Sequence, residues 1–374
     1  MRNSLSLYIH IPFCDTLCDY CDFYSAVKKD FSGSYLKKYL DALIADINYQ
    51  IVHFKVAEIP TVYIGGGTPS VLGPGISLLL EMLNRLPGFS PVEFTVEANP
   101  ESLTEDFLLA CKDNGVNRLS LGVQTFHEAS RKAVNRQGNK AELEERLSLA
   151  SRFYPGALSV DLITGLPHQN KKVVLDDISR LLDYDPAHVS LYSLTLERDT
   201  PLEEKQKNKT IALPDMDTAD SIWLYAKDKL ISSGFNHYEI SNFTKPDKMC
   251  LHNIRYWQME GWFGAGPAAS GTIIDEKNCT AKRYTYVRDI DAYINAPVIH
   301  NAVCEKLDKD ALLRETLLMG YRYYKGPDPE KFKKHFGCSI EECIGQTLSR
   351  WKNKDKMLFL NSFLSEAFLE LDKT

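Results

Sequence analysis

The sequence predicts an α/β protein, a partial (β/α)6 barrel followed by a smaller, mostly helical C-terminal domain. In the first half, six apolar, β-rich runs alternate with segments of helical period. After about residue 300, the periodic segments are helical. Alternating strands and helices indicate a parallel sheet with helices outside. Because six units are too few for a complete eight-fold barrel, we expect an open one.

The six predicted strands cover residues 5–11, 61–64, 92–97, 117–123, 157–163 and 187–194. The predicted helices lie near 34–53, 76–86, 104–114, 140–152, 173–183 and 215–233. Thr104, followed by Glu105 and Asp106, is a typical helix N-cap. Several polar residues follow or end the predicted strands, and in parallel α/β folds ligands bind at that edge.

The chain is expected to divide into three parts. Residues 1–235 form the barrel domain, and residues 236–300 are an irregular linking region rich in aromatics and glycine. Residues 301–374 form the helical domain, with predicted helices at 307–320, 329–336 and 339–352. The lysine-rich stretch 203–210 is expected to be an exposed loop.

Composition restricts the class of protein. With 44% hydrophobic and 25% charged residues, the chain resembles an ordinary soluble globular protein. The net charge of −6 argues against a broad nucleic-acid surface, which needs a basic face. We find no run of about 18 apolar residues and hence predict no membrane span. Peripheral membrane contact stays open.

The N-terminus carries no recognisable secretory signal. The apolar run 5–13 is interrupted by His10 and Pro12, and no small-residue cleavage site follows it. We therefore expect a cytoplasmic, reducing setting, where clustered cysteines indicate metal or redox chemistry.

Three of the nine cysteines lie within eight residues. Cys14, Cys18 and Cys21 form a C-x-x-x-C-x-x-C run directly after the first predicted strand. Three thiolates on one loop can hold three corners of an iron–sulfur cluster and leave the fourth iron open. Zinc is the alternative, in a zinc-stabilised binding module. It needs a fourth ligand at regular spacing, whereas the next cysteine is Cys111.

The surroundings of the cysteine run allow two interpretations. Asp15, Asp19 and Asp22 are expected to be solvated loop carboxylates, although carboxylates facing a cluster would lower its reduction potential. Tyr20 and Phe23 either screen the cluster from water or belong to the core.

A glycine run, Gly65-Gly66-Gly67-Thr68-Pro69, follows the second predicted strand. It lets backbone amides approach a ligand closely, and Thr68 can cap the next helix. Alone this signal is weak, because glycine runs after strands are often only tight turns.

Together these motifs resemble the radical S-adenosylmethionine superfamily, within it the group around oxygen-independent coproporphyrinogen III dehydrogenase. The matching blocks are YIHIPFC (8–14), YIGGGTPS (63–70), VEANPESL (96–103), RLSLGVQTF (118–126), NRQ (135–137), DLITGLPHQ (161–169) and HNIRYW (252–257). The resemblance implies a radical-SAM barrel with a [4Fe-4S] cluster on the three cysteines. Its open iron is chelated by S-adenosylmethionine, which an electron from the cluster cleaves to an adenosyl radical. A reductant protein for the cluster is implied as a partner.

The same resemblance assigns the cofactor-binding residues. Tyr8, Gly66 and Glu97 match the first S-adenosylmethionine site. The positions that match a second site are Gly67, Thr68, Gln124, Arg136 and Asp161. A carboxylate suits ribose hydroxyls, and a guanidinium suits a carboxylate through a bidentate fork. Without the family, Glu97 and Asp161 are interpreted as structural carboxylates and Arg136 as a surface cation.

Two differences distinguish this sequence from the dehydrogenase group. The dehydrogenase carries a further cysteine two residues after the last cluster ligand, where this chain has Phe23, and it has a longer N-terminal extension. Both differences, with the HNIRYW block, are similar to HemW-type haem chaperones. That group implies a role in porphyrin metabolism: haem binding and delivery to a haem-acceptor protein, with His252 as candidate iron ligand. Tyr256, Trp257 and Trp262 are suited to pack on the macrocycle.

The alternatives remain open at this stage. The enzymatic one is oxidative decarboxylation of coproporphyrinogen III, or another radical reaction on a tetrapyrrole. His252 is otherwise a hydrogen-bonded structural histidine. GAGPAASG (264–271) contains the weak G-x-G-x-x-A form of a dinucleotide fingerprint, but no clear strand precedes it and we expect no dinucleotide there. Cys250 is expected to be an ordinary buried thiol.

Overall fold

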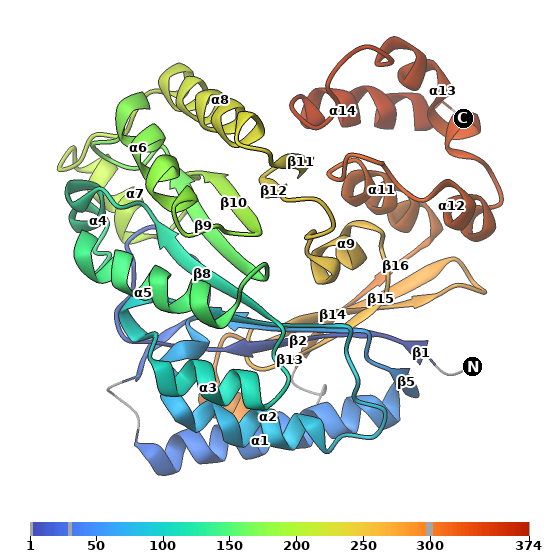
Figure 1. The fold of residues 1–374 in the computed structure, drawn as a ribbon. Coiled ribbons are helices and arrows are strands. Elements are labelled where there is room, and N and C mark those ends of the chain that lie inside the picture. The colour runs from blue at the N-terminus through green and yellow to red at the C-terminus, as the bar shows by residue number, and fades with distance from the viewer. Residues whose placement is uncertain (1–2, 29–31, 297–301, 374) are drawn as a thin grey trace.

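The protein is an α/β structure built on one curved sheet (Figure 1). The computed structural model describes residues 3–28, 32–296 and 302–373. Within them, the main sheet has twelve strands in the order β11-β12-β10-β9-β8-β7-β6-β2-β13-β14-β15-β16. Its centre is the predicted set of six strands, so the (β/α)6 prediction is confirmed.

The six central strands are all parallel, and each lies beside its predecessor in the chain. They are β2 (Ser6–Ile11), β6 (Thr61–Gly66), β7 (Glu93–Ala98), β8 (Arg118–Gln124), β9 (Leu158–Thr164) and β10 (His188–Ser193). Neighbouring strands that follow the chain order form a barrel wall rather than a doubly wound sheet.

Helices cover the outer face of this wall, with α1–α3 below the sheet in Figure 1. They are α1 (Gly33–His53), α2 (Ile76–Asn84), α3 (Glu105–Asp113), α4 (Glu128–Ala133), α5 (Lys140–Phe153), α6 (Lys171–Leu182) and α8 (Met216–Ser232). Thr104 caps α3 as predicted, accepting a hydrogen bond from the Phe107 amide at 3.2 Å.

Short elements connect the barrel units. They are β1 (Asn3–Ser4), β3 (Phe13–Cys14), β4 (Ala26–Val27), β5 (Val56–Glu58), the 3-10 helices Pro69–Gly75 and Pro100–Ser102, and α7 (Pro201–Lys207). The prediction of an exposed loop at 203–210 is wrong for its first five residues, because Thr200 and Pro201 begin α7 there.

The predicted irregular region, as far as the structure describes it (236–296), consists largely of regular elements, contrary to the prediction. Its elements are β11 (Asn236–Glu239), β12 (Asn242–Thr244), α9 (Leu251–Trp257), β13 (Trp262–Ala265), β14 (Ser270–Asp275), β15 (Thr280–Tyr286) and α10 (Ile290–Asn295). β13 pairs with β2 in parallel, and β14–β16 extend the sheet in antiparallel order. β11 pairs with β12 and β14 with β15, which are neighbours in the chain, whereas β13 pairs with the distant β2, which a local pattern does not reveal.

The C-terminal part contains the three predicted helices and one more. β16 (Ala302–Leu307) is followed by α11 (Lys309–Gly320), α12 (Pro329–Phe336), α13 (Ile340–Arg350) and α14 (Leu360–Leu371). These helices enclose their own hydrophobic core, with Leu317, Ile344 and Phe363 fully buried. α14 was not predicted from the sequence.

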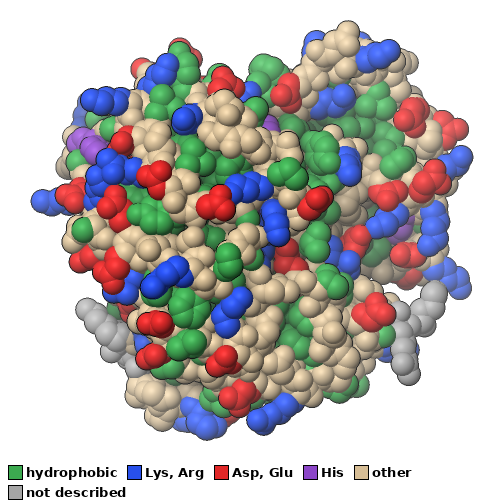
Figure 2. Space-filling view, in the orientation of Figure 1, with side chains coloured by type: hydrophobic (Ala, Val, Ile, Leu, Met, Phe, Trp, Pro, Cys, Tyr) green, Lys and Arg blue, Asp and Glu red, His purple; other side chains and the backbone are tan. Residues whose placement is uncertain are grey.

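The face shown in Figure 2 carries Lys, Arg, Asp and Glu side chains in an interspersed pattern, without a continuous basic area on that face. Among the described helices, none is long and apolar enough to cross a bilayer.

A buried carboxylate ties α1 to the second half of the chain. Asp46 is fully buried and accepts hydrogen bonds from the Tyr286 hydroxyl at 2.6 Å and the Tyr293 hydroxyl at 2.7 Å. Burial raises the pKa of Asp46 to about 7, although the two tyrosine hydrogen bonds oppose the shift. The folded state therefore holds a proton here that the unfolded state has already lost above about pH 4.

From this we predict that Asp46 makes folding pH-dependent. Because its folded pKa is raised, stability is highest at low pH and falls as pH rises from about 4 to about 7, by at most about 1.4 kcal/mol per pH unit. Asp46→Asn should remove this slope in urea unfolding measured between about pH 5 and pH 7.5. Asp41→Asn, an exposed change on the same helix, should leave it unchanged. A slope that persists in Asp46→Asn would contradict the prediction.

Candidate functional site

The six parallel strands have one apolar and one polar face. Leu7, Ile9 and Ile11 of β2 are fully buried, and the other strands bury alternate residues in the same way. The remaining positions carry Tyr8, Tyr63, Glu97, Ser120, Asp161, Ser190 and Tyr192. Since side chains alternate along a strand, these polar groups all project to the face away from the covering helices. The polar face lines the inside of the partial barrel.

Cys14, Cys18 and Cys21 lie on the segment that follows β2, at the C-terminal edge of the barrel. All three are free thiols with partial exposure. Thr68 Oγ1 lies 3.4 Å from Cys14 Sγ, and Arg136 Nη1 donates to Cys18 Sγ at 3.5 Å. Sulfurs on one loop, contacted by a hydroxyl and a guanidinium, are a suitable donor set for an iron–sulfur cluster, whose potential depends on hydrogen bonds to its sulfurs.

The same residues do not form a zinc site. Among the described residues, no three Cys, His, Asp or Glu side chains converge where one metal ion could bind. Structural zinc requires four ligands at about 2.0–2.3 Å from one point. Cluster ligands bind separate iron atoms and need no such point. The geometry therefore favours the cluster over the zinc alternative.

The residues between the cysteines divide into buried and exposed ones. Asp19 is buried and ion-paired with Lys205 of α7, so the expectation that it is a solvated carboxylate is wrong. Asp15 and Asp22 are exposed, as expected. Tyr20 packs against a small cluster that includes Leu202 of α7. The exposed fraction of Phe23 is 67%, so Phe23 is not a core residue.

The glycine run brings the backbone against the cysteine segment. A Cβ on Gly67 would come within 2.7 Å of the Phe13 carbonyl oxygen, and one on Gly66 within 2.6 Å of the His10 ring. Gly66 also has a φ of +110°, which side chains rarely tolerate. These positions therefore require glycine. Thr68 starts the following 3-10 helix without a side-chain capping bond and contacts Cys14 instead.

Glu97 and Asp161 are carboxylates held deep inside the barrel. Tyr63 Oη donates to Glu97 at 2.7 Å, and the Gly66 amide donates to it at 3.3 Å. Burial raises the pKa of Glu97 to about 7 and the pKa of Asp161 to about 6. A cationic or hydroxyl-bearing ligand would stabilise the charged form of both groups.

Tyr8 and Gln124 complete the wall. His10 Nε2 lies 2.8 Å from the Tyr24 carbonyl and must donate to it, so His10 Nδ1 accepts from the Tyr8 hydroxyl at 3.1 Å. Gln124 ends β8 with a φ of +68°, and its buried Oε1 has no hydrogen-bond partner. An acceptor without a protein donor on this wall can accept a hydrogen bond from a ligand's donor group.

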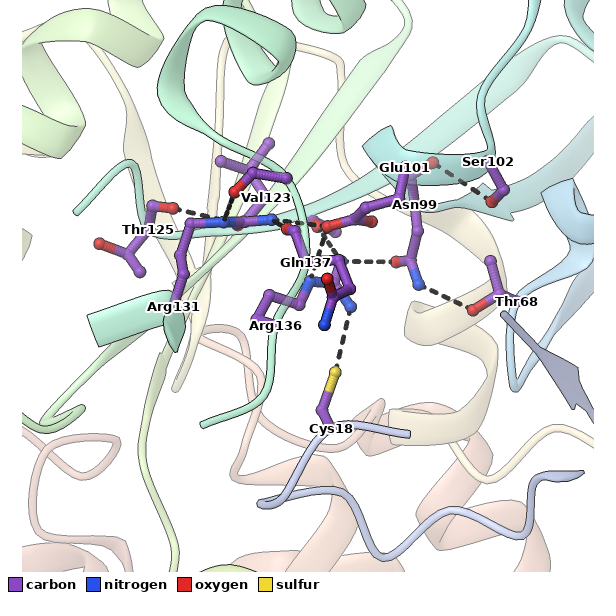
Figure 3. A network of polar contacts seen from close by, with 12 residues as sticks. Cys18, Thr68, Asn99, Glu101, Ser102, Val123, Thr125, Arg131, Arg136 and Gln137 are labelled. Carbon is purple, nitrogen blue, oxygen red and sulfur yellow. Dashed lines mark hydrogen bonds and ion pairs between the residues drawn. The ribbon is translucent and has the colours of Figure 1, made fainter. Parts of the chain in front are cut away.

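Arg136 connects the cysteine segment to two strands (Figure 3). Besides Cys18, its guanidinium donates to Asn99 Oδ1 at 2.8 Å and to the Gly122 carbonyl at 2.5 Å. Asn99 in turn donates to Thr68 Oγ1 at 2.7 Å. Arg136 is 8% exposed, so the surface-cation interpretation is wrong. Thr68, Gly122 and Arg136 thus belong to one network.

The sequence analysis missed the support of this network. Glu101 accepts from Arg131 Nη2 at 2.6 Å and lies 3.3 Å from Arg136 Nε. Arg131 is 1% exposed and also donates to the carbonyls of Val123 and Thr125 at 2.8 and 3.2 Å. Asn99 and Glu101 lie in the matched block VEANPESL, which was a usable signal. Arg131 lies outside every matched block.

His252 lies at the other edge of the barrel. It is 1% exposed, on α9, and its ring bonds Thr61, the first residue of β6, with 2.9 Å between Nδ1 and Oγ1. Its Nε2 lies 2.7 Å from Tyr256 Oη. Burial lowers the pKa of His252 to about 3, so the ring is neutral. The structure does not bring His252 together with the cysteines, and both its ring nitrogens have protein partners.

The rest of the HNIRYW helix is held by buried groups. Glu93, the first residue of β7, accepts from the amides of Leu251 and His252 at 2.9 and 2.8 Å. Cys250 is buried, as expected, with its Sγ 3.5 Å from Glu93. Trp257 is not placed to stack on a ligand, because it packs between Tyr238 and Tyr323.

Tyr256 and Trp262 pack against each other edge to face at 4.7 Å between ring centroids. The glycine-rich block 264–271 forms a tight connection between β13 and β14. A strand does precede it, contrary to our expectation, but an antiparallel strand follows instead of a helix. The block therefore lacks the β-α-β context of a dinucleotide site, as expected.

Comparison with known proteins agrees with this geometry. The family model of the Radical SAM superfamily matches residues 8–181. The structure is similar to that of coproporphyrinogen III oxidase (HemN) from Escherichia coli, with a TM-score of 0.79 at 21% identity, covering 99% of this chain and 90% of that one. Fold and cysteine motif together define a radical SAM protein.

Proteins with similar sequences indicate which family within the radical SAM superfamily this chain resembles. The heme chaperone HemW of Lactococcus lactis is 34% identical, covering 96% of this chain and 92% of its own. HemW of Escherichia coli is 36% identical, covering 72% and 70%. The mouse mitochondrial radical S-adenosyl methionine domain-containing protein 1 is 31% identical, covering 92% and 81%. The chain belongs to the HemW family.

From the buried network we predict that Arg131→Met lowers the free energy of unfolding by about 3–5 kcal/mol, because it breaks a buried ion pair and leaves backbone carbonyls without donors. Urea unfolding followed by circular dichroism measures the loss. Arg180 also contacts two carboxylates, but it is 32% exposed. Arg180→Met should cost much less, because solvent screens exposed ion pairs. Equal losses in the two variants would contradict the prediction.

Proposed function

We propose that this protein is a haem chaperone that binds haem and transfers it to an acceptor protein. The observation that carries the proposal is the similarity to HemW proteins over almost the full length of both chains. Phe23 supports it, since the dehydrogenase group has a cysteine at that position.

The barrel would hold a [4Fe-4S] cluster and S-adenosylmethionine. Cys14, Cys18 and Cys21 would ligate the cluster, which supplies single electrons when reduced by a partner protein. Tyr8, Gly66 and Glu97 would bind one S-adenosylmethionine. A second site would consist of Gly67, Thr68, Gln124, Arg136 and Asp161. The orphaned Gln124 Oε1 and the two raised carboxylate pKa values support a polar ligand on this wall.

We predict that Cys18→Ala abolishes cluster assembly. After anaerobic reconstitution, the unchanged protein should hold about four iron and four acid-labile sulfide atoms per chain. The variant should lose most of both, because one iron loses its ligand. Cys304→Ala, which removes an exposed thiol elsewhere, should retain them. Zinc at about one equivalent without sulfide in the unchanged protein would overturn the cluster assignment.

We also propose His252 Nε2 as the haem ligand. Thr61 uses its one proton to donate to Ser6 Oγ at 2.8 Å, so it accepts from His252 Nδ1–H. The lone pair is then on Nε2, where Tyr256 donates to it. Metal-bound histidines typically donate their other N–H in this way. Ligation would require the Tyr256 hydroxyl to release Nε2.

This geometry predicts opposite effects of two substitutions on haem titration followed at the Soret band. His252→Ala should lose the ligand and bind haem at least about ten-fold more weakly. Tyr256→Phe should bind about five-fold more tightly, because a competing hydrogen bond of about 1 kcal/mol is gone. His53→Ala, an exposed histidine on α1, is the control. An unchanged spectrum and affinity in folded His252→Ala would remove His252 from the site.

The enzymatic alternative is less supported and is separately testable. Its basis is the fold shared with coproporphyrinogen III oxidase, which at 21% identity shows the architecture alone. We expect no decarboxylation of coproporphyrinogen III in the presence of S-adenosylmethionine and a reductant. Robust formation of protoporphyrinogen would favour the enzyme over the chaperone.

A further inference from the structure

Two cysteines outside the barrel have their sulfur atoms in contact. Cys338 follows the left-handed Gly337 that ends α12, and Cys343 lies in the first turns of α13. Their Sγ atoms are 3.1 Å apart. A disulfide bond is about 2.05 Å long, so a closure of only about 1 Å separates the two thiols from a covalent bond.

The turn between the two cysteines is held rigidly. Ser339 accepts from the Glu342 amide at 3.1 Å, and the Glu342 carboxylate accepts from the Ser339 amide at 2.7 Å. This capping box closes both ends of the segment that joins the cysteines. The capping box therefore holds the backbone between the two cysteines in a conformation that allows their sulfurs to approach.

The two thiols differ in accessibility. Cys338 is partly exposed, whereas Cys343 is 8% exposed and faces the hydrophobic core of the C-terminal helices. Burial, with the adjacent Cys338, raises the pKa of the Cys343 thiol to about 12. Cys338 is thus the thiol that a reagent in solution meets first, and Cys343 is held behind it.

A metal site does not explain the pair. Within the described part of the chain, no third Cys, His, Asp or Glu joins the two sulfurs to form a ligand set. Both cysteines pack against the hydrophobic core of the C-terminal helices, Cys343 within it and Cys338 at its partly exposed margin. A dithiol with one accessible and one shielded sulfur is the arrangement of a redox-active pair.

We infer that Cys338 and Cys343 form a reversible intrachain disulfide when the protein meets a low-molecular-weight disulfide. The Cys338 thiolate attacks one sulfur of the reagent, forming a mixed disulfide and releasing the first thiolate. Cys343 Sγ then attacks Cys338 Sγ and releases the second. The protein loses two protons and two electrons, and the reagent becomes two thiols. This inference is independent of the proposed haem transfer.

The test uses the full-length protein with oxidised glutathione as the probe. After exposure, free thiols are alkylated and the protein is cleaved with trypsin without reduction. Lys334 and Arg350 bound a tryptic peptide, residues 335–350, that contains both cysteines and none of the other seven. We expect this peptide to be unalkylated and lighter by two hydrogen atoms. Cleavage after Glu341 and Glu342 should leave two fragments that separate only on reduction.

The intrachain form should exceed the mixed disulfide by about ten-fold or more, because the second attack is intramolecular. Single substitutions should separate the two roles. In Cys343→Ser, Cys338 should keep one glutathione, since no second thiol displaces it. In Cys338→Ser, the buried Cys343 should stay a free thiol. Dithiothreitol should restore both thiols in the unchanged protein.

The exposed Cys304 is the internal standard for the probe concentration. If peptide 335–350 keeps two alkylatable thiols, or carries two glutathione groups, at a concentration that modifies Cys304, the inference is wrong. It is also wrong if Cys343 retains glutathione in Cys338→Ser while Cys338 in Cys343→Ser does not. Circular dichroism of both variants checks that the helices are intact.

Discussion

The structure depends on the burial of one face of six parallel strands. Leu7, Ile9 and Ile11 show the pattern, with every second residue withdrawn against the covering helices. Because strand side chains alternate, all the chemistry of the sheet must use the intervening positions. Tyr8, Glu97 and Asp161 occupy such positions on three strands, which is why groups far apart in the chain face one interior.

A second constraint is the pair of arginines that share Glu101. Arg131 and Arg136 lie on the segment between β8 and β9, and Glu101 follows β7. Through Asn99 and Thr68 the network reaches the Cys14 sulfur, and through Arg136 it reaches Cys18. Two buried cations around one carboxylate are costly unless every donor finds an acceptor. Arg131 donates to several backbone carbonyls and Arg136 donates to that of Gly122, so most of these donors are satisfied and the loops around the cysteines are held in place. Arg136 Nε has only its ion-pair contact with Glu101.

The two motifs of the family lie at opposite edges of the barrel. The cysteines follow the C-terminal end of β2, whereas the HNIRYW helix bonds Thr61 and Glu93, the first residues of their strands. In parallel barrels, the first edge is where chemistry is usually found and the second is where stability is usually determined. Haem bound by His252 would therefore lie apart from the cluster. Electron transfer at the cluster and contact with haem would then take place at separate edges of the barrel.

The sequence by itself determined the parallel barrel, the cysteine loop and the family. These depend on local signals: apolar runs of strand length, helical periods, and motifs that are contiguous in the chain. Only the tertiary structure decided that β13–β16 extend the sheet, since they join the barrel through β13, whose partner β2 is distant in the chain. It also decided that Arg136 is buried on Cys18 and Asn99, that Asp19 pairs with Lys205, and that Phe23 faces solvent. The spacing of residues along the sequence indicates which of them can be neighbours within one loop or strand. Burial and long-range hydrogen bonds arise only when several elements pack together.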